Sequence, residues 1–177
     1  MIDDTSRLRL VALARAALEA RVCDERLPSA LPDDEVPTAG LFVTIYCGGR
    51  LRGCLGTIDA REHLGEAIVR LSADVTREDY RFPPLVRREL ADVTVSLSIL
   101  TPAERVTDPS TIEVGRDGLI VEQGPRRGLL LPQVATEQGW DREMLLRQTC
   151  IKAGLSPDAW QHGATVLRFQ AEVIGEE

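Results

Sequence analysis

The 177-residue sequence lacks the features that mark membrane and secreted proteins. No apolar run approaches the roughly 20 residues that a membrane-spanning helix needs. The first residues, Met-Ile-Asp-Asp, are acidic, and the start of the chain has no cationic stretch followed by an apolar one, as a secretory signal requires. We therefore expect a cytoplasmic protein that does not bind a membrane.

Signals for metal binding are equally scarce. A structural zinc site usually shows closely spaced Cys or His ligands, but the sequence has no C-x-x-C pair, and its two histidines, His63 and His162, lie far apart. The sequence therefore predicts no metal ion and no cofactor. In a reducing cytoplasm we expect free thiols, buried by default, at all four cysteines: Cys23, Cys47, Cys54 and Cys150.

Lysine is almost absent. The chain has 21 basic residues, and only Lys152 is a lysine. Either this single lysine occurs by chance, or its position needs a compact, deprotonatable amine that arginine cannot supply.

The residues that are present describe an ordinary globular chain. It is 44% apolar and 28% charged, with a net charge of −7 and a pI near 5.0. This composition excludes disordered, collagenous and coiled-coil proteins, and the length fits one domain, with or without a small subdomain. The acidic balance argues against nucleic acid as a partner, because phosphates require a field of cations.

Periodicity predicts three elements in the first half. Residues 6–22 are rich in Ala, Leu and Arg and predict a helix with Ser6 as its N-cap. Residues 40–47 and 50–58 predict two strands, which Gly48-Gly49 joins as a hairpin. From Glu62 the apolar residues recur every three or four positions, which predicts an amphipathic helix that ends before Arg81-Phe82-Pro83-Pro84.

The second half alternates short strands and helices. Strands are predicted at 93–100, 128–131 and 166–173, and Asp117-Gly118 predicts a hairpin between 112–114 and 119–122. Helices are predicted at 132–138 and from the N-cap Asp141 to the stop signal Gly154. Because hairpins dominate and no regular βαβ alternation occurs, the predicted class is α+β, with a largely antiparallel or mixed sheet and flanking helices.

Residues 51–57, Leu-Arg-Gly-Cys-Leu-Gly-Thr, carry the strongest chemical signal. In a strand, Arg52 and Cys54 would project from one face with Cα atoms roughly 6 to 7 Å apart, and the guanidinium would favour the thiolate. Gly53 and Gly56 flank the cysteine, and glycines inside a strand often mark the close approach of a ligand or backbone. Alternatively, Cys54 is a small buried side chain and the glycines serve the sheet twist. Spacing alone favours this second interpretation.

Several segments resemble the AMMECR domain family. The similarity spans roughly Leu8 to Val173 and rests on these sequences: Arg-Leu-Arg-Gly-Cys-Leu-Gly-Thr at 50–57, Tyr-Arg-Phe-Pro-Pro-Leu at 80–85, Gly-Leu-Leu-Leu-Pro-Gln-Val-Ala at 128–135, Gly-Trp at 139–140, Cys-Ile-Lys-Ala-Gly-Leu at 150–155 and Asp-Ala-Trp at 158–160. The chain departs from the family at Tyr80, where proline is usual, and at Arg77, where an aromatic or small residue is more common.

The resemblance implies a two-lobed α+β fold, with residues 1–177 as a single domain whose core is about 8–173. It implies no established biochemical activity. In prokaryotes the family is the A component of the AmmeMemoRadiSam system, which implies a Memo-like protein and a radical SAM protein as partners. The family's recurring polar positions map onto Arg52, Cys54, Thr57, Arg81, Gln133, Cys150 and Lys152.

Two functional hypotheses follow. In the first, a polar cluster binds a small anionic ligand or docks a partner protein, with binding residues Arg52, Gly53, Gly56, Thr57, Arg81, Gln133 and Cys150. In the second, Cys54 is the nucleophile of a cysteine-dependent enzyme, in a cleft with Arg52 beside it. Lys152 and Arg81 would bind an anionic group there, and Gln133 would orient it. Lys152 is also the remaining candidate for the base, because neither histidine has a claim to that role. The binding hypothesis is preferred, since no complete catalytic set can be assembled. Both hypotheses expect Cys54 and Lys152 to open onto one cavity.

Some of these residues also have a purely structural interpretation. Lys152 would suit the dipole at the end of its helix, although an arginine would serve equally well. Gln133 could bind a ligand or cap nearby backbone, and Cys150, four residues after Leu146, is expected to be packed rather than reactive.

Overall fold

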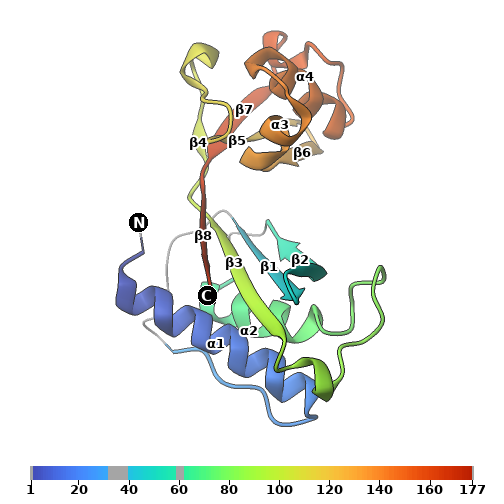
Figure 1. Cartoon of the computed structure of the whole chain (residues 1–177). Coiled ribbons are helices and arrows are strands. Elements are labelled where there is room, and N and C mark those ends of the chain that lie inside the picture. Colours follow the sequence, from blue (N-terminus) through green and yellow to red (C-terminus); the bar gives the residue numbers. More distant parts are fainter. Residues whose placement is uncertain (1, 32–39, 59–61, 177) are drawn as a thin grey trace. The chain divides into compact units, whose positions relative to one another are not determined.

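The computed structural model describes residues 2–31, 40–58 and 62–176 (Figure 1). The chain divides into two compact units. Unit 1 comprises Met1–Leu100 with Glu172–Glu177, and unit 2 comprises Thr101–Ala171. Each unit is built on its own four-stranded sheet. In the described residues, no helix is long and apolar enough to cross a bilayer.

The sheet of unit 1 contains the hairpin that was predicted at Gly48-Gly49. Strands β1 (Gly40–Cys47) and β2 (Arg50–Thr57) are antiparallel, and both turn glycines have the positive φ angles, 55° and 77°, that a tight two-residue turn requires. Strands β3 (Val93–Leu100) and β8 (Ala171–Gly175) complete the order β2-β1-β3-β8. This order leaves β2 at an edge of the sheet.

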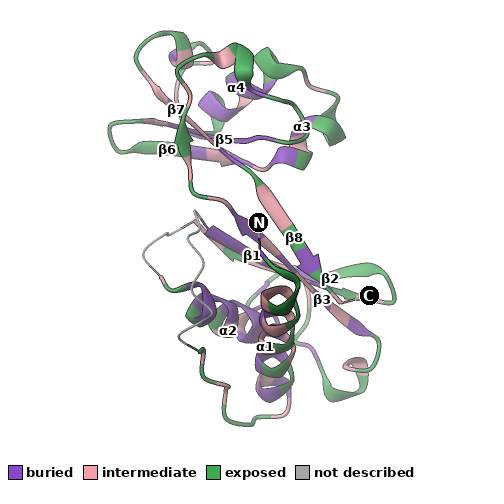
Figure 2. Ribbon diagram, turned by 90° about the vertical axis from the view of Figure 1, so that its left-hand side faces the viewer, coloured by how far each residue is buried: buried purple, intermediate pink, exposed green. Residues whose placement is uncertain are grey.

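Two helices cover one face of this sheet, α1 (Asp4–Val22) and α2 (Leu64–Asp74). Figure 2 shows α2 buried over most of its length, whereas α1 keeps an exposed outer side. The predicted N-cap Ser6 is wrong, because Asp3 caps α1 and its carboxylate accepts a hydrogen bond from the Ser6 backbone N–H. The core between helices and sheet is aliphatic, and none of its described members is aromatic.

Unit 2 carries a second antiparallel sheet of order β4-β7-β5-β6. Its strands are β4 (Glu104–Arg105), β5 (Gly118–Gln123), β6 (Arg126–Leu130) and β7 (Thr165–Phe169). Helices α3 (Pro132–Gln138) and α4 (Arg142–Lys152) pack their buried residues against it, with the predicted cap Asp141 accepting from the Met144 N–H at 2.8 Å. The described residues also include three short 3-10 helices: η2 (Arg87–Glu89), η3 (Pro109–Thr111) and η4 (Ala159–Gln161).

Two predicted elements are wrong. Asp117-Gly118 does not turn a hairpin, because the Asp117 carboxylate is buried and accepts from the Glu113 N–H at 2.9 Å, which closes a local turn instead. The hairpin lies one strand later, between β5 and β6. The single strand predicted at 166–173 is two strands, β7 and β8, which separate at Gln170 and join different sheets. The α+β class and the antiparallel pairing are confirmed.

Candidate functional site

The candidate site lies where a loop runs along the free edge of β2. This edge loop, residues 76–85, leaves the end of α2 and is closed by a 2.7 Å hydrogen bond from the Leu85 N–H to the Thr76 carbonyl. An edge strand presents backbone groups that no neighbouring strand satisfies. In this unit the edge loop supplies partners for those groups at Cys54.

Asp79 is the anchor of the edge loop. Its side chain is buried, with 5% of the residue exposed, and its carboxylate accepts from the Cys54 N–H at 2.9 Å. The Arg81 guanidinium binds the same carboxylate through Nε at 2.9 Å and Nη2 at 2.7 Å. These hydrogen bonds hold the pKa of Asp79 well below its usual range, although burial acts in the opposite direction. Arg81 Nη2 also reaches the Cys54 carbonyl at 3.5 Å. Asp79 and Arg81 together therefore contact both the N–H and the carbonyl of Cys54.

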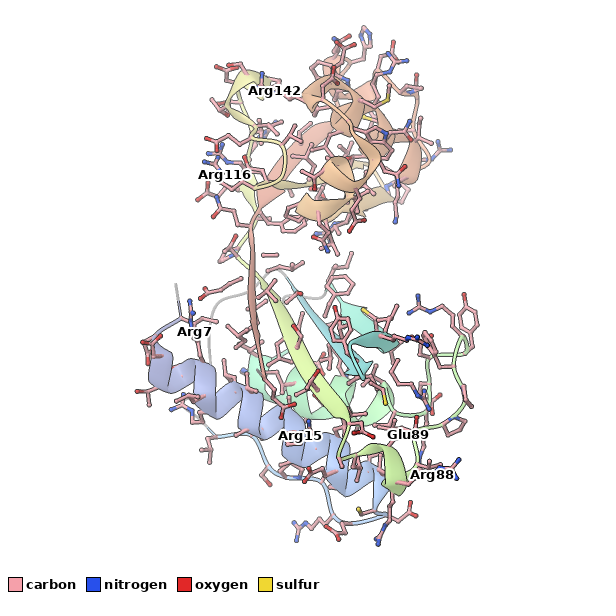
Figure 3. The ribbon with its side chains drawn as sticks, viewed as in Figure 1. Arg7, Arg15, Arg88, Glu89, Arg116 and Arg142 are labelled. Atoms are coloured by element: carbon pink, nitrogen blue, oxygen red, sulfur yellow. The ribbon has the colours of Figure 1, made fainter. Side chains whose placement is uncertain are left out.

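Arg52 also holds the loop. We call the ion pairs Asp79–Arg81 and Arg52–Glu89 the two clamps of the edge loop. Its Nε and Nη2 bind both carboxylate oxygens of Glu89, at 2.9 and 3.2 Å, and Nη1 donates to the Pro83 carbonyl at 2.9 Å. Hydrogen bonds from Arg52 lower the pKa of Glu89. Figure 3 shows Glu89 and Arg88 leaving η2 next to each other. Because Glu89 neutralises Arg52, this guanidinium holds the loop in place and is not free to receive an anion.

A β-bulge alters the alternation predicted for residues 51–56. The register pairs Ile45 with Gly53 but Tyr46 with Leu51, so Arg52 is the extra residue. Leu51 therefore shares a face with Tyr46 and not with Gly53, and the predicted face of Leu51 is wrong. Cys54 and Gly56 lie on the face opposite Gly53, as predicted, because their partners Thr44 and Phe42 alternate with the core residues of β1.

Gly53 and Gly56 permit two different close contacts. A Cβ atom on Gly53 would lie 3.1 Å from the Val75 carbonyl, at the end of α2. A Cβ atom on Gly56 would lie 2.2 Å from the Phe42 ring, which occupies the space above the glycine. Both glycines therefore permit a close approach within the chain, at a backbone in one case and at an aromatic ring in the other.

The thiol of Cys54 lies on the sheet face that the helices of unit 1 leave uncovered. We call this the open face, and its side chains are Phe42, Thr44 and Tyr46 of β1, Leu51, Cys54 and Gly56 of β2, Thr94, Ser96 and Ser98 of β3, and Val173 of β8. The Thr44 hydroxyl donates to Cys54 Sγ at 3.3 Å. None of these residues carries a charge, although 28% of the chain is charged.

The edge loop carries two more aromatic residues. Tyr80 is 96% exposed, and Phe82 is half-buried with its ring 5.4 Å from the Arg81 guanidinium carbon. Thr57, the last of the predicted site residues in unit 1, is half-buried at the end of β2.

The remaining predicted site residues belong to unit 2. Lys152 is exposed in the last turn of α4, and its amine makes no ion pair within the described ranges. Gln133 is exposed in the first turn of α3, and its carbonyl accepts from the Thr136 hydroxyl. Cys150 is fully buried in the core of unit 2, where burial raises the pKa of its thiol.

The structure thus brings together Arg52, Gly53, Cys54, Gly56 and Arg81 in unit 1, while Gln133, Cys150 and Lys152 lie in unit 2. A cavity shared by Cys54 and Lys152 stays a prediction.

Sequence reasoning missed Asp79 and Glu89, the carboxylates that hold both arginines. The signal that could have found them is chemical, since two arginines beside a half-buried strand require anionic partners. Within the described ranges, no three His, Cys, Asp or Glu side chains gather as a metal site would require.

Comparison with known proteins gives consistent matches along nearly the whole chain. A family model described as AMMECR1 matches residues 11–174. A protein of Methanothermobacter thermautotrophicus is 46% identical over 178 residues, covering 95% of this chain and 93% of that protein. Protein TK0174 of Thermococcus kodakarensis is 44% identical over 184 residues, covering 95% and 89%. The crystal structure of uncharacterized protein PH0010 from Pyrococcus horikoshii matches with a TM-score of 0.81 at 39% identity, covering 99% of this chain and 94% of that one.

Proposed function

The chain belongs to the AMMECR1 family, and we propose that it acts as a docking module that binds a protein partner on the open face of unit 1. The partners that the resemblance to the AmmeMemoRadiSam system implies are a Memo-like protein and a radical SAM protein. The proposed setting is the cytoplasm.

The observation that carries this proposal is the distribution of aromatic side chains. All four aromatic residues of unit 1 lie outside its core, namely Phe42, Tyr46, Tyr80 and Phe82. Phe42 and Tyr46 stand on the open face, and Tyr80 and Phe82 stand on the edge loop. Aromatic residues are enriched and charged residues are depleted at the centres of protein interfaces. An uncharged sheet face that bears two aromatic residues, with two more on the neighbouring loop, has this composition.

The two clamps on the edge loop support the same interpretation. Asp79, held by Arg81, binds the Cys54 N–H of β2, and Arg52 of β2, held by Glu89, donates to the Pro83 carbonyl of the loop. Tyr80 and Phe82 are therefore presented from a fixed backbone. A loop that is ordered before binding loses less conformational entropy when a partner docks. The clamps therefore suit a surface whose shape is set in advance.

The cysteine-dependent enzyme is the second hypothesis, and the contacts around Cys54 support it less. Covalent catalysis by cysteine needs a base within hydrogen-bond reach of the thiol. In the described part of unit 1, the hydrogen bond to the sulfur comes from Thr44, which is not a base. The two nearby arginines are already paired with Glu89 and Asp79.

The test measures binding of the full chain to purified Memo-like and radical SAM proteins from the same organism. Ser98→Arg places a charge on the open face, and Tyr46→Ser removes an aromatic side chain from it. We expect wild type to bind at least one of the two proteins and both variants to bind it at least about tenfold more weakly.

The control is Leu8→Ser, which removes a 75% exposed side chain from α1 without touching the open face. It should bind like wild type. Unfolding curves of every variant show whether a loss of binding comes from misfolding. The proposal is overturned if wild type binds neither protein, or if the folded open-face variants bind as tightly as wild type.

A second measurement separates docking from cysteine chemistry. Cys54→Ser replaces the thiol by a hydroxyl of similar shape and removes the nucleophilic sulfur, so the docking hypothesis expects little change in affinity for the partner. The enzyme hypothesis instead expects fast alkylation of Cys54 near neutral pH, because a catalytic cysteine reacts as the thiolate. Slow alkylation together with intact binding by the Ser variant would support docking alone.

A further inference from the structure

The two edges of the unit 1 sheet are protected to different extents. At the β2 edge, the edge loop supplies partners for the N–H and the carbonyl of Cys54. Strand β8 ends the strand order on the opposite side (Figure 1). Its sequence, Ala-Glu-Val-Ile-Gly at 171–175, contains no proline and no basic residue, two devices that commonly keep an exposed edge from pairing. We therefore examined what the β8 edge offers to another strand.

The hydrogen bonds to β3 show which backbone groups of β8 face outward. The Glu176 N–H donates to the Val95 carbonyl at 3.1 Å, and at the other end the Thr101 N–H donates to the Gln170 carbonyl at 2.8 Å. Both bonds fit one antiparallel register, in which every second residue directs its backbone groups toward β3. The residues between them, which direct their N–H and carbonyl groups away from β3, are Ala171, Val173 and Gly175. These groups have no hydrogen-bond partner in the part of the chain that the structure describes.

The side chains of β8 leave this edge without an unpaired charge. Val173 is 63% exposed and stands on the open face. Glu172 points to the helix side of the sheet, where it binds Arg7 of α1 at 2.6 Å. Glu176, just beyond the strand, binds Arg15 of the same helix. Because both carboxylates are neutralised within the chain, they oppose the approach of a second strand only weakly.

From these observations we propose that the β8 edge pairs with the β8 edge of a second copy of this chain, antiparallel about a twofold axis at Val173. In this register the outward groups of Val173 pair with those of the same residue in the second copy, and those of Ala171 pair with those of Gly175. Every outward N–H and carbonyl of the strand then has a partner. The small side chains allow the usual strand spacing of about 4.8 Å. Twofold pairing of identical surfaces is also the commonest form of soluble oligomer.

Two properties of the chain limit the strength of this dimer. The strand has only five residues, and two copies with a net charge of −7 each repel one another. We therefore expect a reversible dimer that becomes tighter as NaCl is added, because salt screens the repulsion. The inference does not depend on the docking function proposed above, since the open face stays uncovered in the paired sheet.

Sedimentation equilibrium of the full chain, from micromolar to millimolar concentration, measures the dimerisation constant. Wild type should pass from monomer to dimer over this range. Val173→Pro removes the central outward N–H but keeps the hydrogen bonds to β3, because an edge strand accepts proline where the N–H faces solvent. This variant should dimerise at least about tenfold more weakly. Val173→Lys should have a similar effect, because it places like charges opposite each other at the twofold axis.

The matched control is Val173→Thr, which keeps the backbone N–H and the β-branched shape and should dimerise like wild type. Unfolding curves show whether each variant is folded, and Val173→Lys decides the outcome if the proline variant is not. The inference is overturned if wild type stays monomeric up to millimolar concentration, or if the folded Pro and Lys variants dimerise as tightly as wild type. Equal weakening by Thr and Pro would show that the side chain and not the backbone makes the contact, which also overturns strand pairing.

Discussion

The two units use their aromatic residues in opposite ways. In unit 2, Trp140 and Trp160 pack against the hydrophobic core, and Phe169 is buried with its ring over Gly118. In unit 1 the core is aliphatic, and all four aromatic residues lie on the open face or the edge loop. Aromatic side chains supply large buried areas wherever stability is needed. Unit 1 reaches a closed core without them, which leaves its aromatic residues available for contacts outside the unit.

The largest effect expected from this comparison is on the stability of unit 2. Phe169→Ala removes a ring that is 1% exposed and leaves a cavity above Gly118. We expect the free energy of unfolding to fall by about 3 kcal/mol, as for other buried Phe to Ala changes. Urea denaturation followed by tryptophan fluorescence measures it, since both tryptophans are in unit 2. A loss below about 1 kcal/mol would contradict the role of this ring.

A smaller but still large effect is expected at the anchor of the edge loop. Asp79→Asn removes a buried charge that binds Arg81 and the Cys54 N–H, and should cost about 2 kcal/mol of unfolding free energy. Urea denaturation followed by circular dichroism, which reports on both units, measures the loss. If Asp79→Asn were as stable as wild type, the result would contradict a stabilising role for the Asp79 carboxylate.

The same carboxylate predicts a pH dependence. Because the pKa of Asp79 is lower in the folded than in the unfolded chain, its stabilisation is complete above the unfolded value of about 3.9 and is lost as pH falls through the lower folded value. Wild type should therefore lose stability with decreasing pH more steeply than Asp79→Asn. If the free energy of unfolding fell equally steeply with decreasing pH for both proteins, Asp79 would not contribute to the pH dependence.

A still smaller effect is expected at the second clamp. Arg52→Lys keeps the charge but cannot bind Glu89 with two parallel hydrogen bonds, so we expect a loss of about 1 kcal/mol. Thermal unfolding measures this change. Arg50→Lys is the matched control on the same strand, because Arg50 is exposed and makes no ion pair in the described chain, and it should unfold like wild type.

The smallest stability effect is expected at Tyr80, and it sharpens the contrast with Phe169. Tyr80 is 96% exposed, so Tyr80→Ala should change the free energy of unfolding by less than about 0.5 kcal/mol. The same variant should bind the Memo-like or radical SAM protein more weakly, because the lost side chain belongs to the proposed interface. Chemical denaturation and the binding assay on one preparation test both statements. Strong destabilisation would show that Tyr80 contributes to folding stability instead.

Local signals in the sequence predicted much of the fold. The glycine pair at 48–49, the alternation in Val93–Leu100 and the cap at Asp141 each act within a few residues, and the structure confirms all three. The final strand was mispredicted for a different reason. Nothing local at Gln170 indicates that the chain passes there from one sheet to another.

The candidate site was predicted in part for the same reason. Arg52 and Arg81 were identified, but their carboxylate partners were not. Glu89 lies 37 residues from Arg52, so that pairing depends on the path of the chain after α2. Asp79 lies only two residues from Arg81, but its burial against the Cys54 N–H, 25 residues away, depends on the path of the edge loop. The bulge at Arg52 also depends on pairing between strands, and the alternation of β2 alone does not reveal it.

Solvent access to the Cys54 thiol tests the docking claim most directly. The full chain is alkylated with iodoacetamide, with and without a saturating amount of the Memo-like or the radical SAM protein, and the modified cysteines are quantified by mass spectrometry. Cys23, half-buried at the end of α1, serves as the internal reference. We predict that one of the two partners slows alkylation of Cys54 at least about tenfold and leaves the rate at Cys23 unchanged. Equal rates at Cys54 with and without either bound partner would contradict docking on the open face.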